Sequence, residues 1–150
     1  MEGSTLIWLP SIESAIPKDV DTIGEKVYAQ RNFLTELVIP DNIKYIADKA
    51  FLDCVNLETI VLPDGLIGIG EEAFRNCVEL NGVSVPATVS QIGAGAFYGC
   101  CSLKDFSVDT ANSDYGYING ALVDYRDNAL VWGDFLKAFP EGLKTIRTPF

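Results

Sequence analysis

The sequence predicts one domain over residues 1–150, an α/β but β-rich solenoid in which short strands and short helical or 3-10 turns repeat along one axis. Leu34, Leu57, Leu80 and Leu103 recur at a constant spacing of 23 residues, and other apolar positions recur with them. The hydrophobic fraction of 48% and the charged fraction of 21% are those of a folded globular chain. Because one such unit cannot bury its own apolar face, stacked copies must supply a continuous core.

The repeated unit reads L-x-x-h-x-h-P-x-x-h-x-x-I-G-x-x-A-F-x-x-C-x-x, where h is apolar. Units begin near residues 11, 34, 57, 80 and 103, and the three in the middle match almost throughout. The first is weaker, and the last loses the pattern at Asp109, where the others have proline. A dozen matching columns at one spacing indicate structural repetition rather than chance.

Each unit begins with a strand, shown in the second unit by Leu34, Leu37 and Ile39, which alternate with polar residues and are expected to face inward. Pro40 ends the strand because it has no N–H to donate. A second turn is expected after Ile46, and Ala50 is expected to start a short helical or 3-10 piece. The predicted core ladder consists of Phe51, Phe74, Phe97, Cys54, Cys77 and Cys100.

This unit resembles the BspA-type leucine-rich repeat, a tandem bacterial repeat that ends in A-F-x-x-C. The resemblance covers roughly Ile12 to Asp109 and the tail from Phe139. It implies a curved leucine-rich-repeat solenoid of the kind common in bacterial cell-surface and secreted proteins, some of which act in adhesion to host proteins. The family carries no catalytic or ligand residues that could be transferred to this sequence.

Residues 112–132 interrupt the repeat as an island, and a partial repeat follows over 134–150. Asn119-Gly120 lies between apolar runs and predicts a hairpin turn, and Arg126–Asn128 fits a second turn. The island is therefore expected to be a small inserted β-meander. The chain ends also resemble each other, since Thr5–Trp8 matches Ala129–Trp132. We therefore expect either a piece of a longer array or a short degenerate paralogue.

Composition and charge exclude several functions. A net charge of −10 without any basic run opposes nucleic-acid binding. The absence of histidine excludes Ser-His-Asp and Cys-His catalysis. No apolar run reaches the roughly 20 residues of a membrane span, so no membrane insertion is expected. The first ten residues lack the basic and apolar regions of a secretory signal.

Two sets of residues could carry metal chemistry. Cys54, Cys77 and Cys100 share a column, but zinc sites favour closely spaced cysteine pairs, so a buried thiol ladder is the stronger interpretation. Cys101 falls one position later and is expected to be exposed. Calcium is one interpretation of the acidic C-terminal third, but the spacing lacks an EF-hand pattern and turn aspartates are favoured. The acidic residues are Asp105, Asp109, Asp114, Asp124, Asp127 and Asp134.

Two surfaces are candidates for binding. The outward strand positions on the expected concave face include Glu36, Val38, Thr59, Val61, Ser84, Asp105 and Ser107. The second candidate is an island contact patch of Tyr115, Tyr117, Tyr125 and Trp132, although these aromatic residues are more often core cover.

The function predicted from the sequence is a non-catalytic protein-binding or adhesion module of a bacterial cell-surface or secreted protein. Its partner is expected to be a protein, including host or extracellular-matrix proteins, and no cofactor is expected. The alternative is a structural spacer or fragment of a longer array with no binding activity, and an enzyme is a remote third reading. Open solenoid ends also predict end-to-end self-association.

Overall fold

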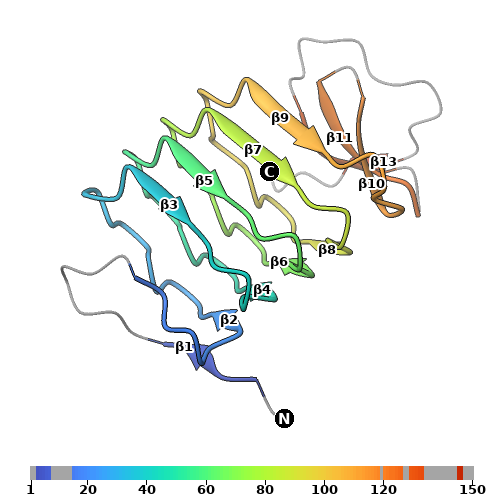
Figure 1. Cartoon of the computed structure of the whole chain (residues 1–150). Coiled ribbons are helices and arrows are strands. Elements are labelled where there is room, and N and C mark those ends of the chain that lie inside the picture. The colour runs from blue at the N-terminus through green and yellow to red at the C-terminus, as the bar shows by residue number, and fades with distance from the viewer. Residues whose placement is uncertain (1–2, 8–14, 119, 127–128, 134–144, 147–150) are drawn as a thin grey trace.

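A computed structural model of the chain describes residues 3–7, 15–118, 120–126, 129–133 and 145–146. Thirteen short strands are assigned within these residues, and no helix is present among them. Figure 1 shows the coils stacked side by side along one axis, with the meander at the C-terminal end. The repeat therefore forms the predicted β-rich solenoid.

The front sheet contains the strand that begins each unit. Its strands are β3 (Glu36–Val38), β5 (Thr59–Val61), β7 (Gly82–Val85) and β9 (Asp105–Val108), in that order. All pair in parallel with a register of one repeat, so that Leu37 lies beside Ile60 and Val83 beside Phe106. The inward side chains of these strands are buried, apart from the half-buried Val108, as the alternation of apolar and polar residues predicts.

A second parallel sheet lies behind the first. It runs in the order β1 (Thr5–Leu6), β2 (Thr22–Ile23), β4 (Tyr45–Ile46), β6 (Gly68–Ile69) and β8 (Gln91–Ile92). The sequence pattern predicts only a turn near Ile46. The strands contain two residues each, which is too short to give a periodic pattern, and the neighbouring coils supply their hydrogen bonds.

The expected helical or 3-10 pieces after Ala50 and its equivalents are not formed, and this part of the prediction is wrong. Two residues four positions apart adopt a positive φ in each coil, for example Lys49 at 58° and Asp53 at 58°. Such residues interrupt a right-handed helix. Consecutive tight turns result, and Phe51 N–H donates to the carbonyl of Ala73 in the next coil at 2.8 Å. Coil-to-coil hydrogen bonds therefore replace the helical ones.

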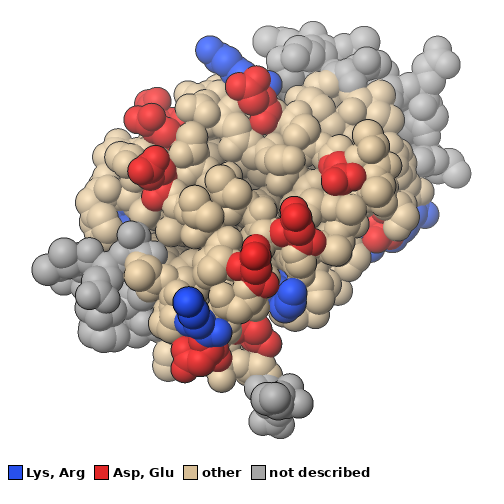
Figure 2. Space-filling view, in the orientation of Figure 1, with Lys and Arg blue, Asp and Glu red and all other residues tan. Residues whose placement is uncertain are grey.

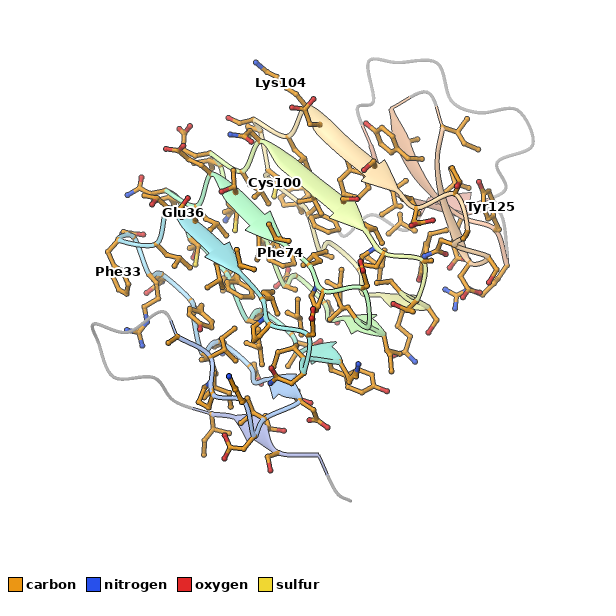
Figure 3. The ribbon with its side chains drawn as sticks, in the orientation of Figure 1. Phe33, Glu36, Phe74, Cys100, Lys104 and Tyr125 are labelled. Carbon is orange, nitrogen blue, oxygen red and sulfur yellow. The ribbon has the colours of Figure 1, made fainter. Side chains whose placement is uncertain are left out.

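The core contains a column of aromatic rings and thiols, which the turns after the back-sheet strands place inside the coils. The rings of Phe51 and Phe74 stack at 5.0 Å between centroids, and those of Phe74 and Phe97 at 5.5 Å. Figure 3 labels Phe74 in this interior. Phe106 continues the column with an edge-on contact to Phe97 at 5.3 Å. The predicted ladder therefore lies in one line through the solenoid.

The inserted meander is confirmed. It consists of β10 (Tyr115–Ile118), β11 (Ala121–Asp124) and β12 (Ala129–Gly133), which are antiparallel. β13 (Thr145–Ile146) pairs in parallel with β12, with Ala129 beside Thr145. β1 pairs with β2 in the same way, with Thr5 beside Thr22. The resemblance between the two chain ends therefore corresponds to a shared strand pairing.

The first unit departs from the others. Ser11–Ser14 lie outside the described residues, and Ala15, Ile16 and Pro17 form no strand. β3 is consequently the first strand of the front sheet within the described residues.

Candidate binding surface

The seven outward strand residues predicted as a binding surface lie on one face of the front sheet, and all are exposed. We call this set, Glu36, Val38, Thr59, Val61, Ser84, Asp105 and Ser107, the strand face. Neighbouring coils place Glu36 beside Thr59 and Val38 beside Val61. Figure 2 views the front-sheet side of the molecule and shows acidic side chains spread over it, with few basic ones. The strand face is therefore a contiguous surface, and its use in binding stays a prediction.

The strand face is most apolar where it begins. Val38 is 70% exposed and Val61, beside it on the next coil, is 54% exposed. They border a hollow of about 550 Å³ whose lining residues are Ala15, Ile16, Glu36, Leu37, Val38, Pro40, Thr59 and Val61. The far end of the face, with Ser84, Asp105 and Ser107, carries only small or acidic side chains.

The meander covers the C-terminal end of the back sheet, at β8. The hydroxyl of Tyr115 accepts the N–H of Ile92 at 2.9 Å, and Nη1 of Arg126 donates to the carbonyl of Ser90 at 2.8 Å. Asn112 adds two hydrogen bonds from its side-chain amide, to the carbonyls of Pro86 and Val89, each at 2.9 Å. These side chains occupy backbone groups that a further coil would otherwise take.

The buried carboxylate of Asp124 holds the Arg126 side chain in place in the meander. Asp124 is 0% exposed and accepts two hydrogen bonds from the Arg126 guanidinium, at 2.9 Å from Nε and 2.6 Å from Nη2. The hydrogen bonds to Asp124 raise the pKa of Arg126 above its already high ordinary value. Nη2 of Arg126 also donates to the Tyr115 hydroxyl at 2.7 Å. The buried charge is therefore paired, as burial requires.

Comparison with known proteins agrees with this architecture. The sequence profile of the BspA type Leucine rich repeat region matches residues 9–118 in six copies. The chain belongs to the BspA-type leucine-rich repeat family. No curated protein matches the BspA-type chain at a significant level.

Solved structures of other bacterial proteins share the fold. A leucine-rich repeat protein from Bacteroides capillosus is 27% identical, covering 71% of this chain and 87% of its own, with a TM-score of 0.64. The T. pallidum leucine rich repeat protein is 29% identical, with 71% of this chain covered and a TM-score of 0.51. This chain spans only 58% of that protein. The pneumococcal vaccine antigen PcpA, 16% identical over 97% of this chain and 51% of its own, shows similarity of fold alone, with a TM-score of 0.50.

The island contact patch is not assembled as predicted. Tyr115 is 1% exposed, so it belongs to the core of this BspA-type chain and offers no surface to a partner. Tyr117 is half-buried against Phe106, with ring centroids 5.1 Å apart. Tyr125 is exposed and lies over the backbone of Gly116, and the side chain of Trp132 lies outside the described residues. Tyr115 and Tyr117 therefore belong to the core and its cover rather than to a contact patch.

The cysteine column that recurs in the repeat is a set of buried thiols. The Sγ atoms of Cys54, Cys77 and Cys100 donate to carbonyls one coil earlier, at 2.9, 3.2 and 3.1 Å. Burial raises the pKa of Cys54 to about 11 and of Cys100 to about 12. A thiol held in its protonated form is a hydrogen-bond donor rather than a metal ligand. Cys101 is exposed.

The acidic C-terminal residues take separate positions. The carboxylate of Asp109 accepts the N–H of Ala111 at 2.8 Å, which is a turn interaction, and Asp124 pairs with Arg126. Asp105 is exposed on the strand face, Asp114 is partly exposed, and Asp127 and Asp134 lie outside the described residues. Within the described part of the chain, no group of three or more metal-binding side chains comes together. Nor does any helix there have the length and apolar character to cross a membrane.

Two features of the site do not follow from the sequence pattern that predicts the strand face. The hollow combines Ile16 and Pro40, which come from different units, with the strand-face valines. The Asp124–Arg126 pair was also missed, although its spacing of two residues across a predicted turn could have indicated a turn-stabilising ion pair.

Proposed function

We propose that this chain is a non-catalytic protein-binding module of a bacterial cell-surface or secreted protein, with the strand face as its binding surface. Adhesion to a host or extracellular-matrix protein is the role that we favour. The observation that carries the proposal is the pair Val38 and Val61, which expose adjoining apolar surface around a hollow. Contiguous exposed apolar surface on a soluble fold is characteristic of interaction sites.

The family and fold support this proposal. Leucine-rich repeat folds are generally non-enzymatic, and a solenoid presents an extended surface suited to protein partners. The bacterial origin of the structural relatives agrees with a bacterial protein, and cell-surface or secreted placement follows from the resemblance to the family. Function nevertheless has to be argued from the site, which is why the valine pair matters more than the fold.

The alternative is a structural spacer that presents other parts of a longer array. Exposed apolar side chains on the strand face would lower the solubility of a spacer without contributing to its role. The valine pair therefore favours binding over a spacer role. Elsewhere on the face, the small polar side chains Ser84 and Ser107 agree with either function.

Surface plasmon resonance of the purified chain over immobilised fibronectin, laminin, collagen and fibrinogen tests the proposal. We expect saturable binding to at least one of them, weakened about tenfold or more when Val38→Lys and Val61→Lys are combined. Ile7→Lys combined with Ile118→Lys is the matched control, because it adds the same charge at exposed apolar positions off the strand face. No binding from the folded chain to any of these proteins, or equal loss in both double variants, would favour the spacer.

A further inference from the structure

Within the residues that the structure describes, the backbone of β3 is hydrogen-bonded along one edge, to β5. The N–H of Ile39 donates to the carbonyl of Val61 at 3.0 Å, and the carbonyl of Thr35 accepts the N–H of Glu58 at 2.8 Å. Successive residues of a strand direct their backbone groups to opposite edges, so Glu36 and Val38 direct theirs away from β5. Among the described residues, β3 pairs with β5 alone. The backbone N–H and carbonyl groups of Glu36 and Val38 are therefore available for pairing at this strand edge.

The hollow described above follows this edge. Its lining includes Leu37, which faces inward, as well as Glu36 and Val38, which face outward. A space that touches both faces of one strand has to run beside the edge of that strand. Ile16 and Pro40 line it as well, together with Thr59 and Val61, whose side chains are exposed on β5. The hollow therefore has the position that an added strand would fill.

Charge indicates the chemistry of such a strand. Glu36 lines the hollow and is exposed, and Figure 3 labels it at the beginning of β3. The chain as a whole carries −10, so a second copy would be repelled and a basic partner attracted. The remaining described side chains of the hollow are apolar, apart from the hydroxyl of Thr59.

We propose that the open edge of β3 binds an extended segment of another protein, in which apolar and basic residues alternate, by adding it as a strand to the front sheet. This inference rests on the proposed function and names the binding mode and partner class of the same surface. The partner residue beside Leu37 would point inward and pack against Ile16. Its neighbours would point outward, where a lysine can lay its stem on Val38 and bring its ammonium to Glu36.

The probe for this proposal is a capped synthetic peptide of alternating valine and lysine, with a valine–glutamate peptide as its charge control. We expect saturable binding of the valine–lysine peptide in fluorescence polarisation, with the valine–glutamate peptide at least about tenfold weaker. The decisive variant is Val38→Pro, which removes one N–H from the open edge but none that pairs with β5. Because proline is also apolar, this variant separates strand addition from simple apolar contact.

We expect Val38→Pro to weaken peptide binding about tenfold or more, while far-ultraviolet circular dichroism stays unchanged. If that variant fails to fold, Glu36→Lys replaces it, and we expect it to reverse the preference between the two peptides. Equal binding of both peptides, or full affinity in Val38→Pro, would overturn the proposal. A concentration-dependent dimer that Val38→Pro abolishes would overturn it as well, by making a second copy the occupant.

The outcomes for the two proposals are separable. If the matrix proteins bind through the strand face but the peptide does not bind, strand addition is wrong and the proposed function stands. If the peptide binds at β3 but no protein in the panel does, the edge is a binding site and the matrix-protein role is wrong.

Discussion

The sulfur of Cys77 lies 3.2 Å from the carbonyl oxygen of Phe51, one coil earlier, and donates its hydrogen to it. Cys54 and Cys100 make the same bond to Tyr28 and Phe74. Each thiol therefore bonds its coil to the preceding one, through the backbone carbonyl of a residue whose ring belongs to the aromatic column. The relationship explains why cysteine recurs at this position, since a small side chain with a donor is required in an apolar column.

Alkaline pH should destabilise the fold through these thiols. Burial holds the pKa of Cys54 at about 11 and of Cys100 at about 12 in the folded chain, whereas the unfolded value is 9.0. As the pH rises, these thiols lose their protons in the unfolded chain before they lose them in the folded chain. Their contribution to the free energy of unfolding is therefore fully present below about pH 9 and falls as the pH rises toward 11 and 12. Urea unfolding at pH 7.5, 9 and 10.5 measures this fall. Replacing all three buried cysteines by alanine should reduce the slope, and an unchanged slope would assign the effect to other groups.

Thiol reactivity gives an independent check of the ladder. Only Cys101 is exposed, so one thiol per chain should react quickly with a disulfide reagent under native conditions and four should react in denaturant. Cys101→Ser should abolish the fast reaction. Rapid native reaction of two or more thiols would show that the column is open to solvent.

Phe74→Ala should cost about 3–5 kcal/mol of the free energy of unfolding. The ring has 0% exposure and stacks between Phe51 and Phe97, so its removal leaves a cavity that the coils cannot close. Chemical denaturation measures the cost, and exposed Phe33→Ala is the control, with an expected change within roughly 0.5 kcal/mol. A loss below about 1 kcal/mol for Phe74→Ala would be incompatible with the stacked column.

Two glycines should respond oppositely to substitution by alanine. A Cβ at Gly93 would lie 2.3 Å from the backbone nitrogen of Glu71 in the preceding coil, whereas a Cβ at Gly82 would meet atoms of Asp105 only at 3.7 Å. Gly93→Ala should therefore lower stability by about 1–3 kcal/mol through forced separation of coils. Gly82→Ala should be neutral or slightly stabilising. Thermal unfolding compares the two, and similar effects at both positions would contradict the close coil spacing.

Arg126→Met should loosen the meander, because it leaves the carboxylate of Asp124 buried without its cation. The expected cost is about 3 kcal/mol, the usual range for breaking one side of a buried pair. Hydrogen–deuterium exchange should rise in β10 and β11 before it rises in the coils. The double variant Asp124→Leu, Arg126→Met should recover most of the loss. If Arg126→Met alone leaves exchange unchanged, the pair does not hold the meander.

The features of the fold that recur with the 23-residue repeat were predictable from the sequence. The inward positions of Leu37, Ile60 and Val83 follow from alternation, and the meander follows from its turn signals. The turn geometry did not follow, because Lys49 and Glu72, ordinarily good helix formers, adopt a positive φ that only the coil-to-coil hydrogen bonds stabilise. The helix propensity of a single segment does not depend on hydrogen bonds to a neighbouring coil, so it cannot predict them. They exist only once the coils are stacked.

The candidate site was predictable in part for the same reason. The exposed column containing Val38 and Val61 can be derived from strand alternation within each unit. The hollow and the open edge of β3 could not, because they depend on how Ile16 of one unit lies beside Pro40 of the next. The burial of Tyr115 was also beyond local reasoning, since its hydroxyl is fixed by the N–H of Ile92.

The most direct test of the account is amide hydrogen–deuterium exchange of the chain with and without a saturating amount of the matrix protein that it binds best. We predict slower exchange in β3 and β5, around Val38 and Val61, and unchanged exchange in the turns over 71–76 and in the meander. Protection confined to those turns or to the meander, with β3 and β5 unaffected, would contradict the assignment of the strand face as the binding surface.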